Sequence, residues 1–257
     1  MISIKKPHEL EKMRRAGAIA ADVLMLLKEM IRPGITTAAI DQAAEDYIRR
    51  SGATPSEKGY RVPGIPTPYP ASVCASVNDQ VVHGIPSENC RLEDGDIVSI
   101  DVMACYEGYH GDCCYTYAVG EISQSRRDLL NITRESLDRA IHMARAGNTL
   151  GHIGHAVESL VIPAGYGLVR EYSGHGIGKR PHEAPMVPNY GRPGRGITLK
   201  SGMTIAIEPM VMSGREDLIN GEDGWLVSTA DGSDAAHFER TVHITEGEPE
   251  ILTPWED

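Results

Sequence analysis

The chain is 257 residues long, which is enough to bury a substantial hydrophobic core as one large domain or two small ones. Its composition is that of an ordinary globular protein, and a net charge of −11 without a dense lysine and arginine run excludes the electrostatic footprint of a nucleic-acid or anionic-membrane binder. The five cysteines include no Cys-x-x-Cys pair, and the sequence has no signal-peptide pattern, so we expect a cytoplasmic protein with reduced thiols. It has no run of about 18 apolar residues, so we expect no membrane span.

The first half of the chain begins with two predicted helices. Apolar residues recur every three or four positions over residues 7–31, with a proline suited to the first turn. A proline and a glycine at 33–34 end this pattern, and Thr36 or Thr37 is placed to cap a second helix that ends at Gly52. A loop rich in proline and glycine follows at 54–70, and strands are predicted at 71–77, 81–85, 97–105 and 113–119.

The second half repeats this order of elements. Helices are predicted at 125–146 and 149–161, and strands at 167–172, 203–211, 224–228 and 237–244. A shift of 113 residues places Gly34 on Gly147 and Thr36 on Thr149, together with several apolar helix positions. Generic helix chemistry explains some of these matches, but we interpret them as a duplication.

The duplication predicts an α+β fold. Each half, about 7–120 and 121–250, has strands that need partners and helices that can cover them. We therefore expect a single domain over residues 1–257, made of two pseudo-symmetric α-α-β halves around one curved antiparallel sheet. A site on the pseudo-two-fold axis would take its ligands from both halves.

A predicted hairpin carries the first two candidate ligands. Its strands are joined by a turn at Glu107-Gly108, and they bring Asp101 and Asp112 roughly opposite each other. Like charges on opposed strand residues are destabilising and aspartate is depleted in strands, so two such carboxylates favour a bound divalent cation. The alternative is that one of these aspartates is an ordinary turn or edge residue.

Acidic residues also occur in strand-like runs of the second half, as the duplication requires. Glu208 lies in an otherwise apolar run, and Glu239 precedes a β-branched run. A solvated strand face explains a lone glutamate in general. Apolar neighbours on both sides of Glu208 favour a buried strand instead, and a buried charge must be paired or bound to a metal.

Three histidines stand where a side chain can face a site. His175 lies in Gly174-His175-Gly176-Ile177-Gly178, a spacing that lets the backbone approach a ligand closely but does not match the dinucleotide-binding fingerprint. His83 and His182 lie where strand-like runs give way to loops, and an ordinary surface histidine explains each of them equally well.

The candidate ligand set consists of Asp101, Asp112, His175, Glu208 and Glu239. Four carboxylates and one imidazole are unsuited to structural zinc and typical of oxygen-preferring divalent ions such as Mn, Fe, Co or a catalytic Zn. Four carboxylates also exceed what one ion needs, whereas two ions about 3.5–4 Å apart and bridged by carboxylates are usual in hydrolytic sites. We therefore expect two divalent ions per chain.

Short motifs occur in a characteristic order along nearly the whole chain. They are Ser76-Val77-Asn78, His83-Gly84-Ile85-Pro86, Asp94-Gly95-Asp96-Ile97-Val98, the pair Asp101 and Asp112, the glycine run around His175, His182-Glu183, Thr204-Ile205-Ala206-Ile207-Glu208-Pro209 and Phe238-Glu239. Their order and spacing resemble a type I methionine aminopeptidase of the bacterial kind, in the first subfamily of the M24 peptidases.

The resemblance implies the pita-bread α+β fold and a dinuclear enzyme that removes the N-terminal methionine when the second residue is small. By position, it implies Asp101 as a terminal ligand of one ion, and His175 and Glu208 as ligands of the other. Asp112 and Glu239 are implied as bridging ligands. A hydroxide between the ions would attack the first peptide carbonyl, with Glu208 or a neighbouring carboxylate handling the proton.

The resemblance also implies the substrate contacts. His182 would stabilise the developing oxyanion, and His83 would contact the scissile amide. Tyr69, Cys74 and Trp225 stand at positions that line the methionine pocket, where sulfur and aromatic surfaces suit a thioether. The implied partners are the N-termini of nascent polypeptides and short peptides. We expect a monomer without a nucleic-acid or membrane partner, and ribosome association stays open.

Two features depart from the pattern of this family. Pro181 stands where an aromatic residue usually precedes the second histidine, and the loop at 59–70 is longer than usual. Both lie at the rim of the expected pocket, so they bear on side-chain selectivity rather than on metal chemistry. Two alternatives stay open: an X-prolyl peptidase of the same fold, and a non-enzymatic binding relative.

Overall fold

The helices form two pairs separated by strands in the computed structural model, which describes residues 2–256. They are α1 (Pro7–Met30), α2 (Thr37–Arg50), α3 (Gln124–Met143) and α4 (Leu150–Val161). All four predicted helices are confirmed, with bounds that differ by a few residues. Thr36 is the cap of α2, because its side chain accepts a hydrogen bond from the Ala39 N–H.

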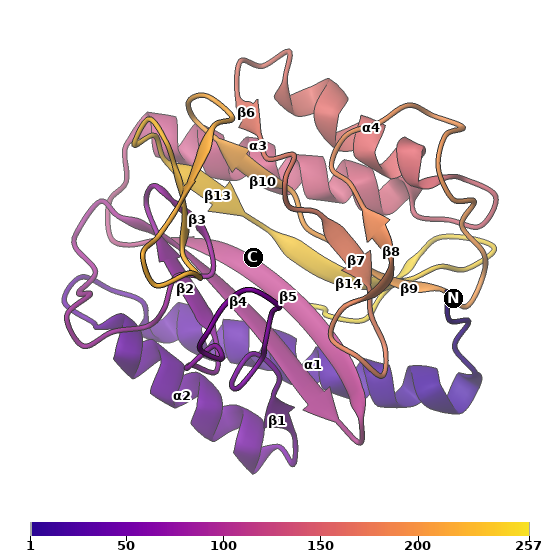
Figure 1. Cartoon of the computed structure of the whole chain (residues 1–257), viewed down its shortest axis with the longest axis horizontal. Helices are drawn as coiled ribbons and strands as arrows, with labels where there is room; N and C mark the ends of the chain where they lie inside the picture. The colour runs from indigo at the N-terminus through magenta and orange to yellow at the C-terminus, as the bar shows by residue number, and fades with distance from the viewer. Residues whose placement is uncertain (1, 257) are drawn as a thin grey trace.

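Nine strands form one sheet that contains both halves of the chain, and all of its pairings are antiparallel. The order is β1 (Thr54–Pro55), β4 (Ile97–Tyr106), β5 (Tyr109–Ala118), β14 (Glu239–His243), β9 (Thr204–Ile207), β7 (Gly174–Gly176) and β8 (Glu183–Val187), with β2 (Cys74–Val77) on β4 and β15 (Glu250–Ile251) on β14. Because β5 pairs directly with β14, the two halves meet in the middle of the sheet (Figure 1). We propose on this ground that residues 1–257 form a single domain, with halves near 7–120 and 121–250.

Two three-stranded sheets lie beside the main sheet. One has the order β13 (Ala235–His237), β10 (Met210–Met212) and β6 (Gly167–Leu168), and the other β11 (Leu218–Asn220), β12 (Val227–Thr229) and β3 (Gln80–Val82). The single strands predicted at 203–211 and 237–244 are therefore wrong. Each run is divided, at Glu208-Pro209 and at Phe238, and passes from one sheet to another. Proline lacks the N–H that a continuous ladder needs.

Other strand predictions were too long or missed short strands. The run at 81–85 stops at Val82, because His83 adopts a left-handed backbone conformation with φ of 60°. The strands expected at 71–77 and 224–228 begin only at Cys74 and Val227. The sequence pattern missed β1, β7, β8, β11 and β15, which have two to five residues each and too few positions to show a period.

The hairpin of β4 and β5 turns at Glu107-Gly108, as predicted. Both residues have positive φ, 48° and 78°, which suits the two-residue turn that matches strand twist. The register differs from the expectation, because Asp101 lies opposite Cys114 and Asp112 lies opposite Met103. The two aspartates are thus offset by two residues, which still leaves both side chains on one face of the sheet.

Helix α1 packs directly on β5 through two glycines. A Cβ on Gly111 would lie 2.4 Å from the Gly17 nitrogen, and a Cβ on Gly17 would lie 2.1 Å from the Leu252 carbonyl oxygen. Residues 252–255 also contact the main sheet, because the Trp255 indole N–H donates to the carbonyl of Glu239 in β14 at 3.1 Å. Figure 1 shows α1 and α2 beside the strands of the first half, and α3 and α4 beside those of the second.

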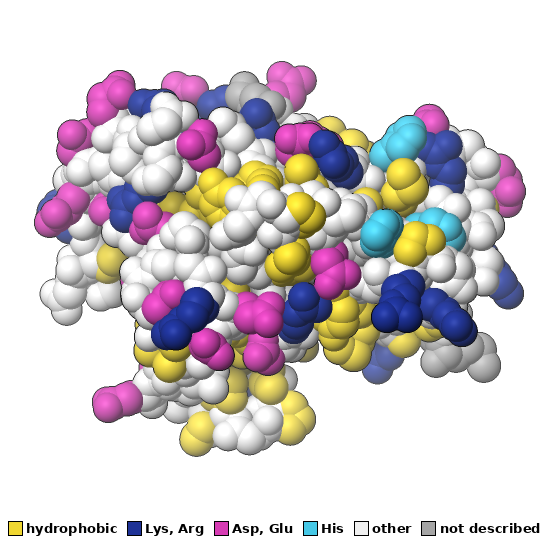
Figure 2. Space-filling view, turned by 90° about the horizontal axis from the view of Figure 1, so that it is seen from above, with side chains coloured by type: hydrophobic (Ala, Val, Ile, Leu, Met, Phe, Trp, Pro, Cys, Tyr) yellow, Lys and Arg dark blue, Asp and Glu magenta, His cyan; other side chains and the backbone are white. Residues whose placement is uncertain are grey.

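The surface agrees with the charge pattern of the sequence. On the face that Figure 2 shows, lysine and arginine side chains are interspersed with aspartate and glutamate, without a continuous basic stripe. Among residues 2–256, no helix is both long enough and apolar enough to cross a membrane.

Candidate functional site

A cavity of about 280 Å³ opens over the middle of the main sheet. All ten sequence-predicted site residues line it: Tyr69, Cys74, His83, Asp101, Asp112, His175, His182, Glu208, Trp225 and Glu239. They come from both halves of the chain. The structure therefore brings together every residue that the sequence singled out, and their geometry shows what the cavity can bind.

One row of side chains crosses the main sheet beneath the cavity. The directly opposed residues on β2, β4, β5 and β14 are Cys74, Asp101, Cys114 and Glu239. Opposed residues point to the same face, and so does Asp112, two positions before Cys114. Three carboxylates from three neighbouring strands thus face the cavity.

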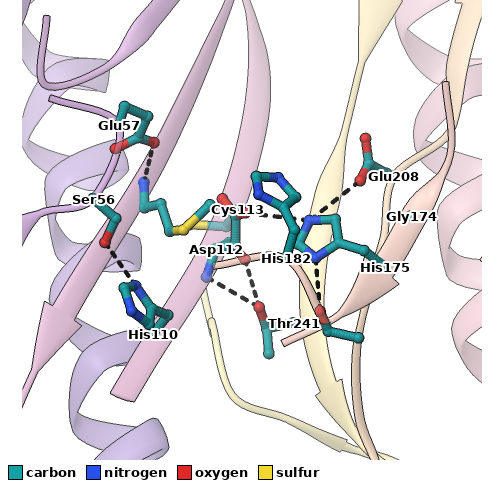
Figure 3. Close-up of polar contacts among 12 residues, drawn as sticks. Ser56, Glu57, His110, Asp112, Cys113, Gly174, His175, His182, Glu208 and Thr241 are labelled. Carbon is teal, nitrogen blue, oxygen red and sulfur yellow. Dashed lines mark hydrogen bonds and ion pairs between the residues drawn. The ribbon is translucent and has the colours of Figure 1, made fainter. Parts of the chain in front are cut away.

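Glu208 and His175 add to this group from the second half. Glu208 directly follows β9, at the end of that strand's pairing with β14. The His175 Nε2 atom lies 3.6 Å from Asp112 Oδ2 and 3.6 Å from Glu208 Oε1 (Figure 3). The Nδ1–H donates to the Gly176 carbonyl at 3.0 Å, which leaves the Nε2 lone pair facing the carboxylates. A metal-binding histidine needs this tautomer.

Several carboxylate oxygens of the cavity lack a partner. Asp101 Oδ1, Asp112 Oδ1 and Glu239 Oε1 are shielded from solvent and have no hydrogen-bond partner among residues 2–256. Burial, followed by the neighbouring Asp112 carboxylate, raises the pKa of Asp101, Glu208 and Glu239 well above the usual range. Such a group is stable as charged carboxylates only when a cation neutralises it.

The donor atoms have the spacing that a divalent cation requires. Asp112, His175 and Glu239 each offer one ligand atom, and the three atoms lie within 4.8 Å of one another. Carboxylate oxygens with an imidazole nitrogen suit Mn, Fe, Co or a catalytic Zn. The residues present therefore fit a metal centre.

Two histidines lie on the walls above the carboxylates. The His182 ring centroid is 4.3 Å from that of His175, and its Nδ1 is 2.8 Å from the Tyr60 hydroxyl. Desolvation in the cavity, followed by the His175 ring, lowers the pKa of His182 to about 4. Desolvation also lowers the pKa of His83. The His83 and Trp225 rings meet edge to face, with ring centroids 6.3 Å apart. Both imidazoles are neutral near neutral pH.

An apolar recess adjoins the carboxylates. Tyr69 and Trp225 meet edge to face with ring centroids 5.2 Å apart, and both pack with Cys74 in one buried cluster. The Tyr69 hydroxyl donates to the Gly84 carbonyl at 2.8 Å, so its polar atom is satisfied away from the recess. Because Cys74 lies opposite Asp101, the recess begins directly beside the carboxylates.

Sequence reasoning missed one carboxylate and one histidine of the cavity. Glu57 comes from the loop after β1, where proline and glycine give no period to follow. His237 lies on β13 with Nε2 3.8 Å from Glu208 Oε2, and burial lowers its pKa to about 3. Its place two residues before Glu239 was a usable signal, because residues two apart in the expected strand at 237–244 share a face.

Known proteins resemble this chain in sequence and in fold along nearly its whole length. The family model described as metallopeptidase family M24 matches residues 11–246. A methionine aminopeptidase of Clostridium acetobutylicum is 48% identical over 253 residues, covering 98% of this chain and 99% of that protein. The crystal structure of a methionine aminopeptidase from Thermotoga maritima superposes with a TM-score of 0.95 at 43% identity, over 100% of both chains. A prolidase from Pyrococcus furiosus reaches a TM-score of 0.77 at 26% identity, over 99% of this chain and 66% of that chain.

Proposed function

The chain belongs to metallopeptidase family M24, and we propose that it is a methionine aminopeptidase, a hydrolase that removes the N-terminal methionine when the second residue is small. The observation that carries this proposal is a carboxylate and histidine centre lying directly beside an apolar recess lined by Tyr69, Cys74 and Trp225. A centre for amide hydrolysis and a pocket for one apolar side chain are what such an exopeptidase needs.

The proposed centre holds two divalent ions per chain, drawn from Co, Mn, Fe or Zn. Family membership shows the use of divalent metal, and the unpartnered oxygens of the cavity fit it. We assign Asp101 as a terminal ligand of one ion, and His175 and Glu208 as ligands of the other. Asp112 and Glu239 are the proposed bridging ligands. When bound, the ions supply Lewis acidity and lower the pKa of water.

The protein residues around this centre have separate proposed roles. Glu208 takes up the proton that the attacking water loses and delivers it to the leaving amine. His182 is held at Nδ1 by Tyr60, so its Nε2 is the nitrogen that contacts the carbonyl oxygen as negative charge develops there. His83 lines the same cavity beside Trp225 of the recess, and we assign to it the contact with the scissile amide.

Substrate selection is assigned to the recess and its rim. Sulfur and aromatic surfaces make favourable contacts with a thioether, which supports Tyr69, Cys74 and Trp225 as the methionine pocket. The long loop at 59–70 contributes Tyr60, Val62 and Tyr69 to the cavity wall. The departure noted in this loop therefore acts on selectivity at the rim, and we propose the same effect for Pro181 through its neighbour His182, which lines the cavity.

The substrates are the N-termini of peptides and proteins. We also propose that the enzyme acts as a cytoplasmic monomer on nascent polypeptides, with ribosome association as an open extension. Size-exclusion chromatography and co-sedimentation with ribosomes test these two points independently of activity.

A peptide panel tests the proposed activity directly. Peptides that begin Met-Ala or Met-Gly should lose methionine in the presence of Mn, Co or Fe, and a chelator should stop the reaction. Met-Leu peptides should be cut much more slowly. Cleavage of Xaa-Pro bonds with Met-Ala left intact would overturn the assignment in favour of an X-prolyl peptidase, the activity of longer proteins such as the Pyrococcus furiosus prolidase.

A further inference from the structure

Glu57 places a further carboxylate in the cavity, outside the five expected ligands. Its Oε1 accepts a hydrogen bond from the Met103 N–H at 2.5 Å, and its Oε2 is shielded from solvent without a hydrogen-bond partner in the described part of the chain. Figure 3 shows Glu57 on the side of Asp112 that faces away from His175 and Glu208. It therefore lies at the end of the centre where only Asp101 was expected to bind as a terminal ligand.

The backbone holds Glu57 in this place. Strand β1 pairs with β4, with Pro55 opposite Ala104, and the Ser56 N–H donates to the Met103 carbonyl at 2.9 Å. The Met103 N–H returns a hydrogen bond to the Glu57 side chain. Two hydrogen bonds to one residue of β4 thus fix the position of the carboxylate before any ligand binds.

Glu57 forms a second ion-sized group of ligand atoms. Glu57, Asp101 and Asp112 each offer one oxygen, and the three oxygens lie within 4.8 Å of one another. Ligand oxygens lie about 2.0–2.6 Å from a divalent ion, so one ion can reach all three. Asp112 belongs to this group and also to the group with His175 and Glu239.

The burial of this group points to a bound cation. Asp112 is 3% exposed, and its Oδ1 has no hydrogen-bond partner from any described residue. Within residues 2–256, no lysine or arginine forms an ion pair with Glu57, Asp101 or Asp112. Burial and the charges of both aspartates raise the pKa of Glu57. Three carboxylates held together without a cationic side chain need a neutralising ion.

We propose that Glu57 is a protein ligand of the same divalent ion as Asp101 and Asp112. This inference rests on the proposed metal centre and adds a ligand to it. The ion at this end then has only oxygen ligands from the protein, whereas the other ion has the His175 nitrogen. Oxygen ligands suit Mn²⁺, and an imidazole also suits Zn²⁺ or Co²⁺, so the two positions differ in ion preference.

The test compares metal binding of the wild type and Glu57→Gln. Gln keeps an oxygen for the Met103 hydrogen bond but loses the charge. Calorimetric titration with Mn²⁺ should show two bound ions for the wild type. In the variant, one of the two ions should bind at least about tenfold more weakly, because replacing even a residue that only orients a metal ligand lowers metal affinity about 10- to 100-fold. Electron paramagnetic resonance should show coupled Mn²⁺ pairs in the wild type and single ions in the variant.

Asp41→Asn is the matched control. Asp41 is a half-buried carboxylate that accepts the backbone N–H groups of Ser72 and Val73, and it does not line the cavity. This variant should bind both ions as the wild type does. Anomalous diffraction from the Mn²⁺-loaded wild type tests the same contact without any variant, and an ion beyond coordination distance of Glu57 would overturn the proposal.

Other outcomes separate this inference from the proposed function. Unchanged Mn²⁺ binding by Glu57→Gln, with a raised KM for the peptide, would overturn it and assign Glu57 to the substrate amine. If Glu57→Gln loses one ion but the loaded wild type leaves Met-Ala peptides intact, the ligand assignment stands and the proposed function fails. If metal-dependent cleavage occurs and the variant binds both ions normally, the function stands and this inference fails.

Discussion

The His175 Nε2 atom lies 3.6 Å from Asp112 Oδ2, although His175 belongs to β7 of the second half and Asp112 to β5 of the first. The candidate centre therefore sits at the seam between the halves, as the duplication led us to expect. An ion bound by both residues would tie the halves together. Because ligands that bind only the folded state stabilise it, metal binding should also stabilise the fold.

The residue shared by both ligand groups should be the most sensitive to change. We expect Asp112→Asn to abolish binding of both ions and to lower kcat/KM by more than about 100-fold. Replacing even a residue that only orients a metal ligand lowers metal affinity or activity about 10- to 100-fold. Elemental analysis and peptide cleavage check this. Glu107→Gln, on the exposed turn of the same hairpin, should leave both quantities unchanged. Wild-type activity of Asp112→Asn would contradict the bridging role.

Removing metal should make stability depend on pH. Burial raises the pKa of Asp101, Glu208 and Glu239 above the ordinary values of 3.8 and 4.5. Above about pH 4 the metal-free folded chain then holds more protons than the unfolded chain, so its free energy of unfolding falls as pH rises. The Tm gain from Mn²⁺, measured by calorimetry, should therefore be larger near pH 8 than near pH 5. An equal Tm gain at both pH values would contradict raised pKa values for these carboxylates in the metal-free folded chain.

The Tyr60 hydroxyl should raise kcat by holding the His182 ring in place. Tyr60→Phe removes the group 2.8 Å from His182 Nδ1, and one hydrogen bond contributes about 0.5–1.5 kcal/mol. We expect kcat to fall about 2- to 10-fold with KM nearly unchanged, because the bond orients a group that acts as charge develops. Tyr172→Phe is the control, since Tyr172 lines the same cavity beside His83. An effect on KM alone would mean that Tyr60 only binds substrate.

No side chain should fit at Gly111, where β5 contacts α1. A Cβ on Gly111 would lie 2.4 Å from the Gly17 nitrogen, so Gly111→Ala should destabilise the fold by about 1–3 kcal/mol or more through overpacking. Denaturant unfolding measures this. Gly247→Ala, where the added Cβ meets nothing closer than 4.0 Å, should be nearly neutral. Equal stability of the two variants would refute close packing as the reason for Gly111.

The sequence predicted what depends on local pattern. The four helices follow from apolar periodicity and capping residues, and the hairpin follows from the Glu107-Gly108 turn. Asp101, Asp112, Glu208 and Glu239 were found because charged residues in apolar strand runs are conspicuous. The predicted register of the hairpin is two residues off, because Tyr106 and Tyr109 flank the two-residue turn as an opposed pair and so place Asp101 opposite Cys114.

The sequence did not predict what depends on tertiary arrangement. Pro209 is a local signal for the first break, because proline lacks an N–H, but no residue type marks the break at Phe238, where the chain also passes from one sheet to another. Glu57 lies in an irregular loop, and only the pairing of β1 with β4 brings it to the cavity. His237 could have been predicted, because it lies two residues before Glu239, although its contact with Glu208 depends on the tertiary arrangement.

The contacts of residues 252–255 have a consequence for how the protein is made. The Leu252 carbonyl lies against Gly17, and Trp255 holds the carbonyl of Glu239. A ribosome releases α1 and the hairpin of β4 and β5 long before it releases this segment. During synthesis, α1 therefore lacks its contact with residues 252–255. Contacts between residues so distant in sequence also form slowly. Glu239 and the segment that holds its carbonyl are made late, so the candidate centre is complete only after both have left the ribosome.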